Sequence, residues 1–225
     1  MARLALNLNS NYLKGDTTMT NFLLTISREH GSGGRLVGKA VADDLKIPFY
    51  DDEIRTLTAQ KSGLSQDFIA KSAESLPNRF LHNLNYSAYS SYDSISFYDI
   101  PATDKLFLAQ SEVIKELAAK GSCVIIGRCA DFVLREEPNL IKIMIRGETE
   151  DRIRSAVDNY GLSPEKAGER LKKIDKARTN YYKYYTNRRW GDLNNFDLVI
   201  NTSFTGIEGA AAIIKTMLDT KKESK

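Results

Sequence analysis

Residues 22 to 34 read Phe-Leu-Leu-Thr-Ile-Ser-Arg-Glu-His-Gly-Ser-Gly-Gly, and this stretch decides the fold. Its first part, Phe22 to Ile26, is a short β-prone run, and the glycine-rich turn Gly31 to Gly34 comes soon after it. Beyond the turn, apolar residues recur at spacings of one, three and four and form one helical stripe, at Leu36, Val37, Ala40, Val41 and Leu45. The stretch therefore predicts a strand that enters a glycine turn and a helix that leaves it.

The same alternation of short strands and helices continues to the C-terminus. Short apolar runs rich in β-branched residues predict further strands over residues 47–50, 123–126, 141–145 and 198–200. Helices are predicted over residues 53–61, 104–120, 149–159 and 207–219. A long helix starts with Ser163 as its N-cap and Pro164 in its first turn. This order indicates an α/β fold with helices on both faces of a parallel sheet of about five strands.

The domain organisation follows from length and from one break in the pattern. A chain of 225 residues with 42% apolar content suits one core with an insertion. Residues 1–20 are polar and aperiodic, so we expect a disordered leader before a single domain over residues 21–225. The strand–helix rhythm breaks between about residues 61 and 103, where residues 85–100 are dense in Tyr and Ser. We interpret this segment as an insertion that contributes to a binding site, an exposed loop or a dimer contact.

Charge, hydropathy and cysteine content narrow the function classes. The formal net charge of +3 comes from 32 basic and 29 acidic residues, a balance that argues against binding to nucleic acid or membrane surfaces. No run approaches the ~18 apolar residues of a membrane helix, so we expect a soluble, cytoplasmic protein. Cys123 and Cys129 lack the spacing of a disulfide framework or a zinc site and are expected to be buried.

The glycine turn is a candidate anion site, because backbone amides and the positive end of a helix dipole meet there. The common phosphate-binding pattern is G-x-x-x-x-G-K-[S/T], in which the lysine contacts the terminal phosphates and the hydroxyl holds magnesium. If Gly31-Ser32-Gly33 matches the G-S-G with which such loops often end, Gly33 is the second glycine of the pattern, Gly34 stands in place of the lysine and Arg35 in place of the hydroxyl. A plain βα turn is the alternative reading. Arg28 and Arg35 favour the anion site, since guanidinium groups bind phosphate oxygens in pairs.

Further charged residues follow the later strands. Arg128 comes directly after the strand at residues 123–126, at the edge where open α/β sheets bind ligands. Asp175 and Arg178 lie three residues apart on one helix face. A surface salt bridge without a functional role is the more frequent explanation of such a pair. Residues 181–190 mix tyrosine with arginine; they would either stack on bases or pack on the core, and we favour packing.

Five motifs of the chain together resemble the cytidylate kinase-like family of nucleoside-monophosphate kinases. They are LTISREHGSGGRLVGKAVADDL (24–45), IPFYDDEI (47–54), VIIGRCADFVL (124–134), LIKIMIRGETEDRI (140–153) and IDKARTNYYKYYTNRRWGDLNNFDLVINTS (174–203). The resemblance covers nearly the whole chain after Thr20. It implies a three-layer P-loop nucleotide-kinase-like fold, an acceptor-binding insertion over about residues 61–103 and a small lid over about residues 163–192.

The resemblance also implies an activity and a set of site residues. A protein of this kind transfers the γ-phosphate of ATP, with Mg²⁺, to a nucleoside monophosphate, and we expect a pyrimidine acceptor such as CMP; a homodimer is possible. The implied nucleotide-binding residues are Arg28, Gly31, Ser32, Gly33, Gly34 and Arg35. The implied acceptor-binding residues are Asp51, Arg128 and Asp131. The implied catalytic residues are Arg35, Arg128, Asp175 and Arg178.

Departures from the family pattern keep other functions open. Besides the missing loop lysine and hydroxyl, Ile126 and Cys129 replace the acidic residues that flank the Gly-Arg pair in cytidylate kinases, and Asp131 is the nearest substitute. Ile174 replaces the first lid arginine. The metal ligands therefore stay unassigned. The alternatives are a catalytically impaired nucleotide-binding regulator, a kinase for an unidentified small-molecule acceptor and, least favoured by the charge balance, a nucleic-acid binder that uses residues 181–190.

Overall fold

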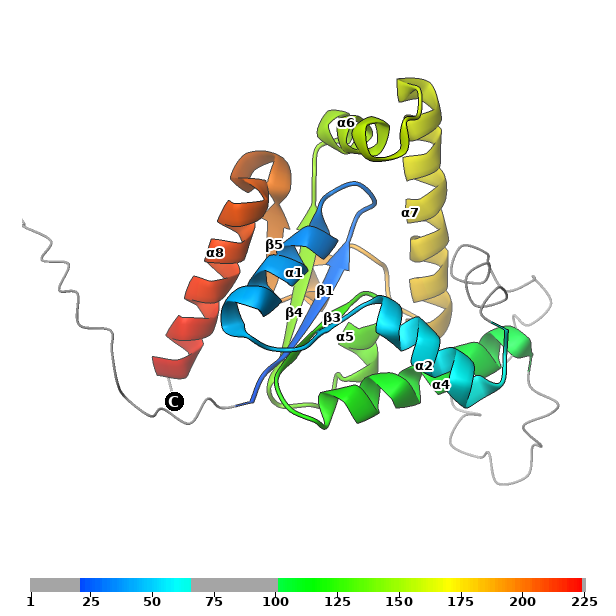
Figure 1. Ribbon diagram of the computed structural model, residues 1–225, viewed down its shortest axis with the longest axis vertical. Coiled ribbons are helices and arrows are strands. Elements are labelled where there is room, and N and C mark those ends of the chain that lie inside the picture. Colours follow the sequence, from blue (N-terminus) through cyan, green and yellow to red (C-terminus); the bar gives the residue numbers. More distant parts are fainter. Residues whose placement is uncertain (1–20, 66–100, 224–225) are drawn as a thin grey trace, which may run out of the picture.

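The computed structural model describes residues 21–65 and 101–223, and its centre is a parallel five-stranded sheet (Figure 1). The strands are β1 (Leu23–Arg28), β2 (Phe49–Tyr50), β3 (Cys123–Ile126), β4 (Leu140–Arg146) and β5 (Leu198–Asn201). Their order is β2-β3-β1-β4-β5, and every neighbouring pair is parallel. The central strand is β1, where Leu24 pairs with Val124 on one side and Ile141 on the other. The carboxyl ends of all five strands consequently meet at one edge.

Helices cover both faces of the sheet and produce the three layers expected from the sequence (Figure 1). One face carries α1 (Gly34–Leu45) and α8 (Thr202–Glu223). The other carries α4 (Ala102–Ala118), the short α5 (Ala130–Val133) and the C-terminal part of α7 (Pro164–Thr186). Next to these, α2 (Asp52–Ser62) packs on α4, and α6 (Thr149–Tyr160) packs on α7. A 3₁₀ turn, Leu193–Asn195, precedes β5.

The apolar strand residues divide between the two layers because side chains alternate along a strand. Leu24 and Ile26 of β1 pack in the cluster with α1 and α8, whereas Leu23 packs in the cluster with α4, α5 and α7. Both faces of the strands are covered, which explains why the strands read as continuous apolar runs in the sequence.

Most predicted elements are confirmed within a few residues. Two differ at their ends, and one short helix was not predicted. Only Phe49 and Tyr50 of the strand predicted over residues 47–50 pair with β3, because the N–H of Ile47 donates to the carbonyl of Ala42 (3.0 Å) and closes the turn after α1. Helix α8 begins at Thr202, before the predicted residue 207, and contains a kink at Gly206 (φ 67°). Helix α5 was not predicted, since its four residues are too few to show helical periodicity.

Two predictions about the chain's organisation lie largely outside the described residues. These are the leader over residues 1–20 and most of the insertion over residues 61–103; the described ends of the insertion are the C-terminus of α2 at Ser62 and the N-terminus of α4 at Ala102. Within the described ranges, no helix combines the length and the apolar content that crossing a membrane requires.

The predictions about buried residues are confirmed. Cys123 and Cys129 are free thiols in the core, and burial raises the pKa of Cys123 to about 11. The tyrosine-rich segment packs on the core: Tyr182 and Tyr185 are buried, and the Tyr185 ring stacks on Phe107 of α4 with ring centroids 4.0 Å apart.

Candidate functional site

The glycine turn between β1 and α1 presents backbone amides at the carboxyl edge of the sheet. Gly31 (φ 80°) and Gly33 (φ 73°) adopt left-handed conformations that turn the chain into the helix. The first helical hydrogen bond runs from the N–H of Val37 to the carbonyl of Gly33 (3.0 Å). The amides of the first helical turn, from Gly34 to Leu36, therefore have no intrahelical acceptor. With the helix dipole, these amides offer hydrogen-bond donors and a positive potential to an anion.

Ser32 shapes this turn from the inside. Its side chain is buried, and its hydroxyl lies 2.9 Å from the carbonyl oxygen of Glu29 and 3.2 Å from that of Ile145. Its own carbonyl accepts a hydrogen bond from the hydroxyl of Thr202 at the start of α8 (2.8 Å). Because the hydroxyl donates inward, Ser32 contributes the shape of the turn, and the structure directs no side-chain oxygen of this residue toward a ligand.

Arg28, the last residue of β1, extends from the turn toward the end of β3. Its guanidinium lies against Gly127, at which a β-carbon would overlap the Nη1 atom. Part of the side chain stays exposed, but protein atoms surround the charged group. Burial, followed by repulsion from Arg178, lowers the pKa of Arg28 to about 9, with Asp51 opposing the shift. The guanidinium is thus still charged at neutral pH, in surroundings that a bound anion would relieve.

Arg128 is held at the end of β3 by a strained backbone. Gly127 (φ 65°), Arg128 (φ 58°) and Cys129 (φ 54°) adopt left-handed conformations in succession, and two of the three are not glycine. Such strain costs about 1–3 kcal/mol per residue and is concentrated at functional sites. The carbonyl of Arg128 accepts from the side-chain amide of Gln110 (3.4 Å), and its Nη1 atom donates to the Gln110 amide oxygen (3.5 Å). Its Nε atom is buried with no hydrogen-bond partner among the described residues.

Asp175 and Arg178 join α7 to the glycine turn and do not form an isolated surface pair. Arg178 donates from Nη1 to the carbonyl oxygen of Arg28 (2.8 Å), and the same atom lies 3.6 Å from a carboxylate oxygen of Asp175. Asp175 accepts a hydrogen bond from the backbone N–H of His30 (2.9 Å). Both side chains are at most a quarter exposed, at 19% and 25%. The predicted lid residues therefore reach the turn directly.

Arg152 of α6 completes this connection, and sequence reasoning missed it. Its Nε atom donates to the carbonyl of His30 (2.8 Å), and its other nitrogens pair with the carboxylates of Glu29 (3.3 Å) and Asp175. The side chain is only 11% exposed. One buried guanidinium thus links β1's end, α6 and α7.

Arg35 and Asp51 are paired with each other. The Nε atom of Arg35 lies 2.6 Å from the Asp51 carboxylate, and its Nη2 atom lies 3.6 Å from Asp52. Asp51 follows β2 and is buried, whereas the Arg35 side chain is 56% exposed. In this structure Arg35 therefore points along the sheet edge toward the end of β2 and not over the glycine turn.

Asp131 is bonded within the core and not to another predicted site residue. It belongs to α5, is buried, and accepts a hydrogen bond from the hydroxyl of Tyr182 on α7 (2.6 Å). Burial raises the pKa of this carboxyl, and the hydrogen bond from Tyr182 opposes the shift. Its position suits a buried link between α5 and α7, and we do not carry it into the proposals below.

Four predicted arginines nevertheless converge. Arg28 is close enough to Arg35, Arg128 and Arg178 for each to lower its pKa, and Arg55 of α2 similarly acts on Arg128. Across residues 21–65 and 101–223, neither Arg28 nor Arg128 forms an ion pair with a carboxylate. Arg35 is paired with Asp51 and Arg178 with Asp175, so Arg28 and Arg128 carry the uncompensated charge. This positive cluster lies beside a helix N-terminus at the carboxyl edge of a parallel sheet, and it is a candidate anion-binding site.

The carboxylates near the turn are not free to hold a metal. Asp51 is paired with Arg35, Glu29 accepts from the N–H of Gly147 (3.0 Å), and Asp175 is held by His30 and Arg152. The described residues contain no cluster of three or more His, Cys, Asp or Glu side chains arranged around a metal position. The part of the chain that the structure describes therefore shows no dedicated magnesium site, and no step is assigned to the metal. Magnesium that enters with ATP is held chiefly by phosphates and water.

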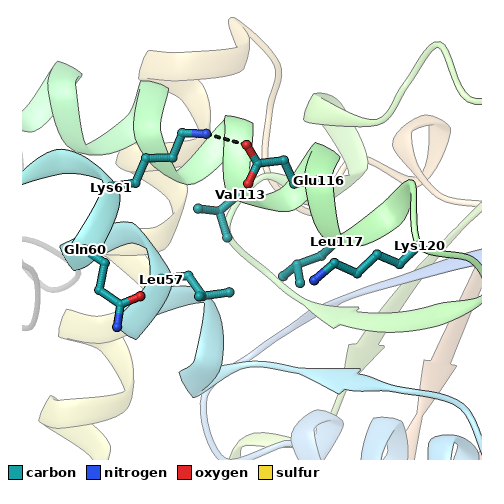
Figure 2. Close-up of a pocket in the computed structure, with 7 residues that line it drawn as sticks. All are labelled: Leu57, Gln60, Lys61, Val113, Glu116, Leu117 and Lys120. Carbon is teal, nitrogen blue, oxygen red and sulfur yellow. Dashed lines mark hydrogen bonds and ion pairs between the residues drawn. The ribbon is translucent and has the colours of Figure 1, made fainter.

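A surface pocket lies between α2 and α4, and no residue of the arginine cluster lines it. Its lining combines apolar and polar side chains, namely Leu57, Val113 and Leu117 with Gln60, Lys61, Glu116 and Lys120 (Figure 2). Lys61 pairs with Glu116 and with Glu112 (3.0 Å). None of these residues belongs to the predicted site, and the ion pairs tie the two helices together.

The fold is that of the P-loop kinases. Comparison with solved structures agrees. An uncharacterized protein from Eubacterium ventriosum is 28% identical, with a TM-score of 0.66 over 89% of this chain and 99% of that one. Shikimate kinases from Bacteroides thetaiotaomicron (11% identity, TM-score 0.50, coverage 89% and 99%) and Acinetobacter baumannii (14%, 0.51, coverage 91% and 96%) share the fold.

The family model described as the cytidylate kinase-like family matches residues 23–204, and the chain belongs to that family. A search of curated proteins finds no match.

Gly127 provides a test of how firmly Arg28 is held. We expect Gly127→Ala to lower the free energy of unfolding by about 1–2 kcal/mol, because alanine must adopt a positive φ while the flexible end of Arg28 moves aside. Gly161→Ala is the matched control, with φ 62° and nothing within 4 Å of the added β-carbon, and should lose about as much. Chemical denaturation measures both. A much larger loss at Gly127 would show that the Arg28 guanidinium cannot move aside.

Proposed function

We propose that the protein transfers the γ-phosphate of ATP to a nucleoside monophosphate, with a pyrimidine nucleotide such as CMP as the acceptor. The single observation that carries this proposal is the convergence of Arg28, Arg128 and Arg178 beside the N-terminus of α1, with few carboxylates to compensate them. Transfer between two phosphates brings several negative charges together, and its catalysis consists mainly of alignment and charge neutralisation. Membership of the cytidylate kinase-like family supports the same reaction.

Each part of the cluster has a place in this reaction. The amides of the glycine turn and Arg28 bind the donor phosphates, since they surround the helix N-terminus. Arg128 binds the phosphate of the acceptor, because it follows β3 and is steadied by Gln110 on α4. Arg178 lies between them, bonded to the carbonyl of Arg28, and neutralises the group in transfer. Asp175 positions Arg178 and the turn, and Asp51 with Arg35 borders the acceptor side.

The experiment is phosphate transfer from ATP with magnesium to a panel of acceptors, with ATP binding measured on the same preparation. The panel contains CMP, dCMP, UMP, AMP and GMP, and also shikimate, the ligand of one structural neighbour. Product from a pyrimidine monophosphate supports the proposal, and product from shikimate alone identifies a small-molecule kinase. ATP binding without product on any acceptor identifies a nucleotide-binding regulator. The missing loop lysine and hydroxyl are the observation that favours this second candidate.

The acceptor role of Arg128 predicts a selective change in kinetics. We expect Arg128→Ala to raise the KM for the acceptor monophosphate about 100-fold, while the KM for ATP changes much less, because a charge-assisted bidentate contact to one substrate is lost. Steady-state kinetics with each substrate varied in turn measures the split. Arg154→Ala is the control, since the Arg154 side chain is 70% exposed and pairs with Asp151 of its own helix (3.0 Å). A parallel rise in both KM values would contradict the assignment.

A further inference from the structure

The glycine turn departs from the usual phosphate-binding pattern at two positions that are related in space. In G-x-x-x-x-G-K-[S/T] the first glycine comes five residues before the second, and the lysine directly follows the second. With Gly33 as the second glycine, Arg28 stands at the first glycine position and Gly34 at the lysine position. The glycine and the long cationic side chain have therefore changed places between the two ends of the turn.

The structure explains why both changes occur together. A β-carbon on Gly34 would lie 2.5 Å from Cβ of Arg28, 3.1 Å from its Cγ and 3.2 Å from Cβ of Ile145. A contact of 2.5 Å essentially never occurs at a real β-carbon, and Cβ of Arg28 is fixed by the central strand. The space beside the turn consequently accommodates one side chain, from residue 28 or from residue 34, but not both.

We propose that Arg28 supplies the cation that phosphate-binding turns ordinarily take from their lysine, so that the terminal donor phosphates are held by a side chain from the end of β1. This inference rests on the proposed function only in placing polyphosphate at the turn. The side chain of Arg28 starts where that of a residue at position 34 would start, and it ends at Gly127, beside Arg128 and Arg178. Its charge therefore lies between the turn and the acceptor side.

The surroundings of Arg28 leave its charge without a partner, as expected of a residue that binds an anionic ligand. Within the described ranges Arg28 has no carboxylate partner, although burial and neighbouring arginines disfavour its charge. Arg178 donates to the Arg28 carbonyl, so the same residue is linked through its backbone to the proposed lid. A guanidinium also donates in pairs to phosphate oxygens, which a lysine does not. On the far side, a β-carbon at Gly127 would lie 1.9 Å from Nη1 of Arg28, so a side chain at position 127 would turn the guanidinium aside.

A double-mutant cycle tests the exchange, with Arg28→Gly, Gly34→Lys and the combined variant. Binding of ATP and of inorganic tripolyphosphate is measured by calorimetry, since the second probe lacks a base and reports on phosphate contacts alone. We expect Arg28→Gly to weaken tripolyphosphate binding about 100-fold. Gly34→Lys alone should be unstable because it collides with Arg28. The combined variant, which restores the usual pattern, should fold and bind at least about tenfold more tightly than Arg28→Gly.

A second pair of variants keeps the test decisive if the lysine variants fold poorly. Gly34→Ala should lower the melting temperature, and adding Arg28→Gly should return most of the loss. Arg154→Ala, an exposed arginine of α6, should leave tripolyphosphate binding unchanged.

The possible outcomes separate this inference from the proposed function. Unaltered tripolyphosphate binding by Arg28→Gly, in a wild-type protein that transfers phosphate, overturns the inference and leaves the kinase standing. Wild-type binding that depends on Arg28, without transfer to any acceptor, supports the inference and overturns the kinase. Absence of tripolyphosphate and ATP binding by the wild type overturns the inference as well.

Discussion

Arg178→Ala is expected to lower the turnover number for phosphate transfer about a thousandfold while ATP still binds. In the structure this guanidinium donates to the carbonyl oxygen of Arg28 (2.8 Å) and adds to the positive charge around Arg28 and Arg128. Arginines that neutralise a phosphoryl group in transfer contribute most in the transition state, where charge spreads over its oxygens. The loss should therefore appear in turnover more than in ground-state affinity.

The measurement is steady-state transfer to whichever acceptor the wild type uses, accompanied by calorimetric ATP binding. Lys176→Ala is the control, because Lys176 is an exposed cation on the same helix and has no ion pair among the described residues. Arg178→Lys adds a useful comparison, since it keeps the charge and loses the paired donors. If Arg178→Ala turned over as fast as the Lys176 variant, Arg178 would be a structural link between α7 and β1 and nothing more.

The sheet and the approach of the arginines were predictable for physical reasons. Strands covered on both faces need continuous apolar runs, and such runs are visible in the sequence at residues 123–126 and 141–145. Arg28 ends β1 and Arg128 comes two residues after β3, and parallel strands bring their carboxyl ends to one edge. Their proximity therefore follows from local sequence and topology together.

The burial of Arg152 could not be predicted from the sequence. It lies in the same amphipathic helix as Arg154, two positions away, and both look like residues of a solvated face. Only the docking of α6 against the β1–α1 turn distinguishes a side chain that is 11% exposed from one that is 70% exposed. That docking depends on tertiary packing, which a single sequence does not reveal.

Two further features were hidden for local reasons. The left-handed conformations of Arg128 and Cys129 carry no sequence signal, because residues other than glycine rarely adopt them. Asp131 was placed in the acceptor site on sequence proximity to Arg128. The short helix α5 turns it inward instead, onto the hydroxyl of Tyr182.

Arg152→Ala is expected to lower the free energy of unfolding by about 3 kcal/mol, the largest stability effect among the charged residues described. Removing the guanidinium leaves the carboxylates of Glu29 and Asp175 poorly compensated in a region that excludes water, and it leaves the carbonyl of His30 without its donor. Glu29 keeps the N–H of Gly147 and Asp175 keeps the N–H of His30, so the loss should stay below that of a wholly unpaired buried charge.

Denaturant unfolding of Arg152→Ala beside Arg154→Ala makes the comparison within one helix. Arg154 pairs with Asp151 at 3.0 Å but is 70% exposed, and such pairs contribute about 0.5 kcal/mol or less, so its removal should be nearly neutral. A larger loss of unfolding free energy for Arg152→Ala than for Arg154→Ala would show that the contact of α6 and α7 with the glycine turn stabilises the protein. The backbone carbonyl oxygen of Arg152 lies 2.8 Å from the β-carbon position of Gly31, so α6 packs closely on the turn, and weaker docking of α6 should loosen the turn itself. Weaker tripolyphosphate binding by Arg152→Ala, at a temperature where the variant is folded, would show that anion binding depends on this buried arginine; unchanged binding would limit its role to stability.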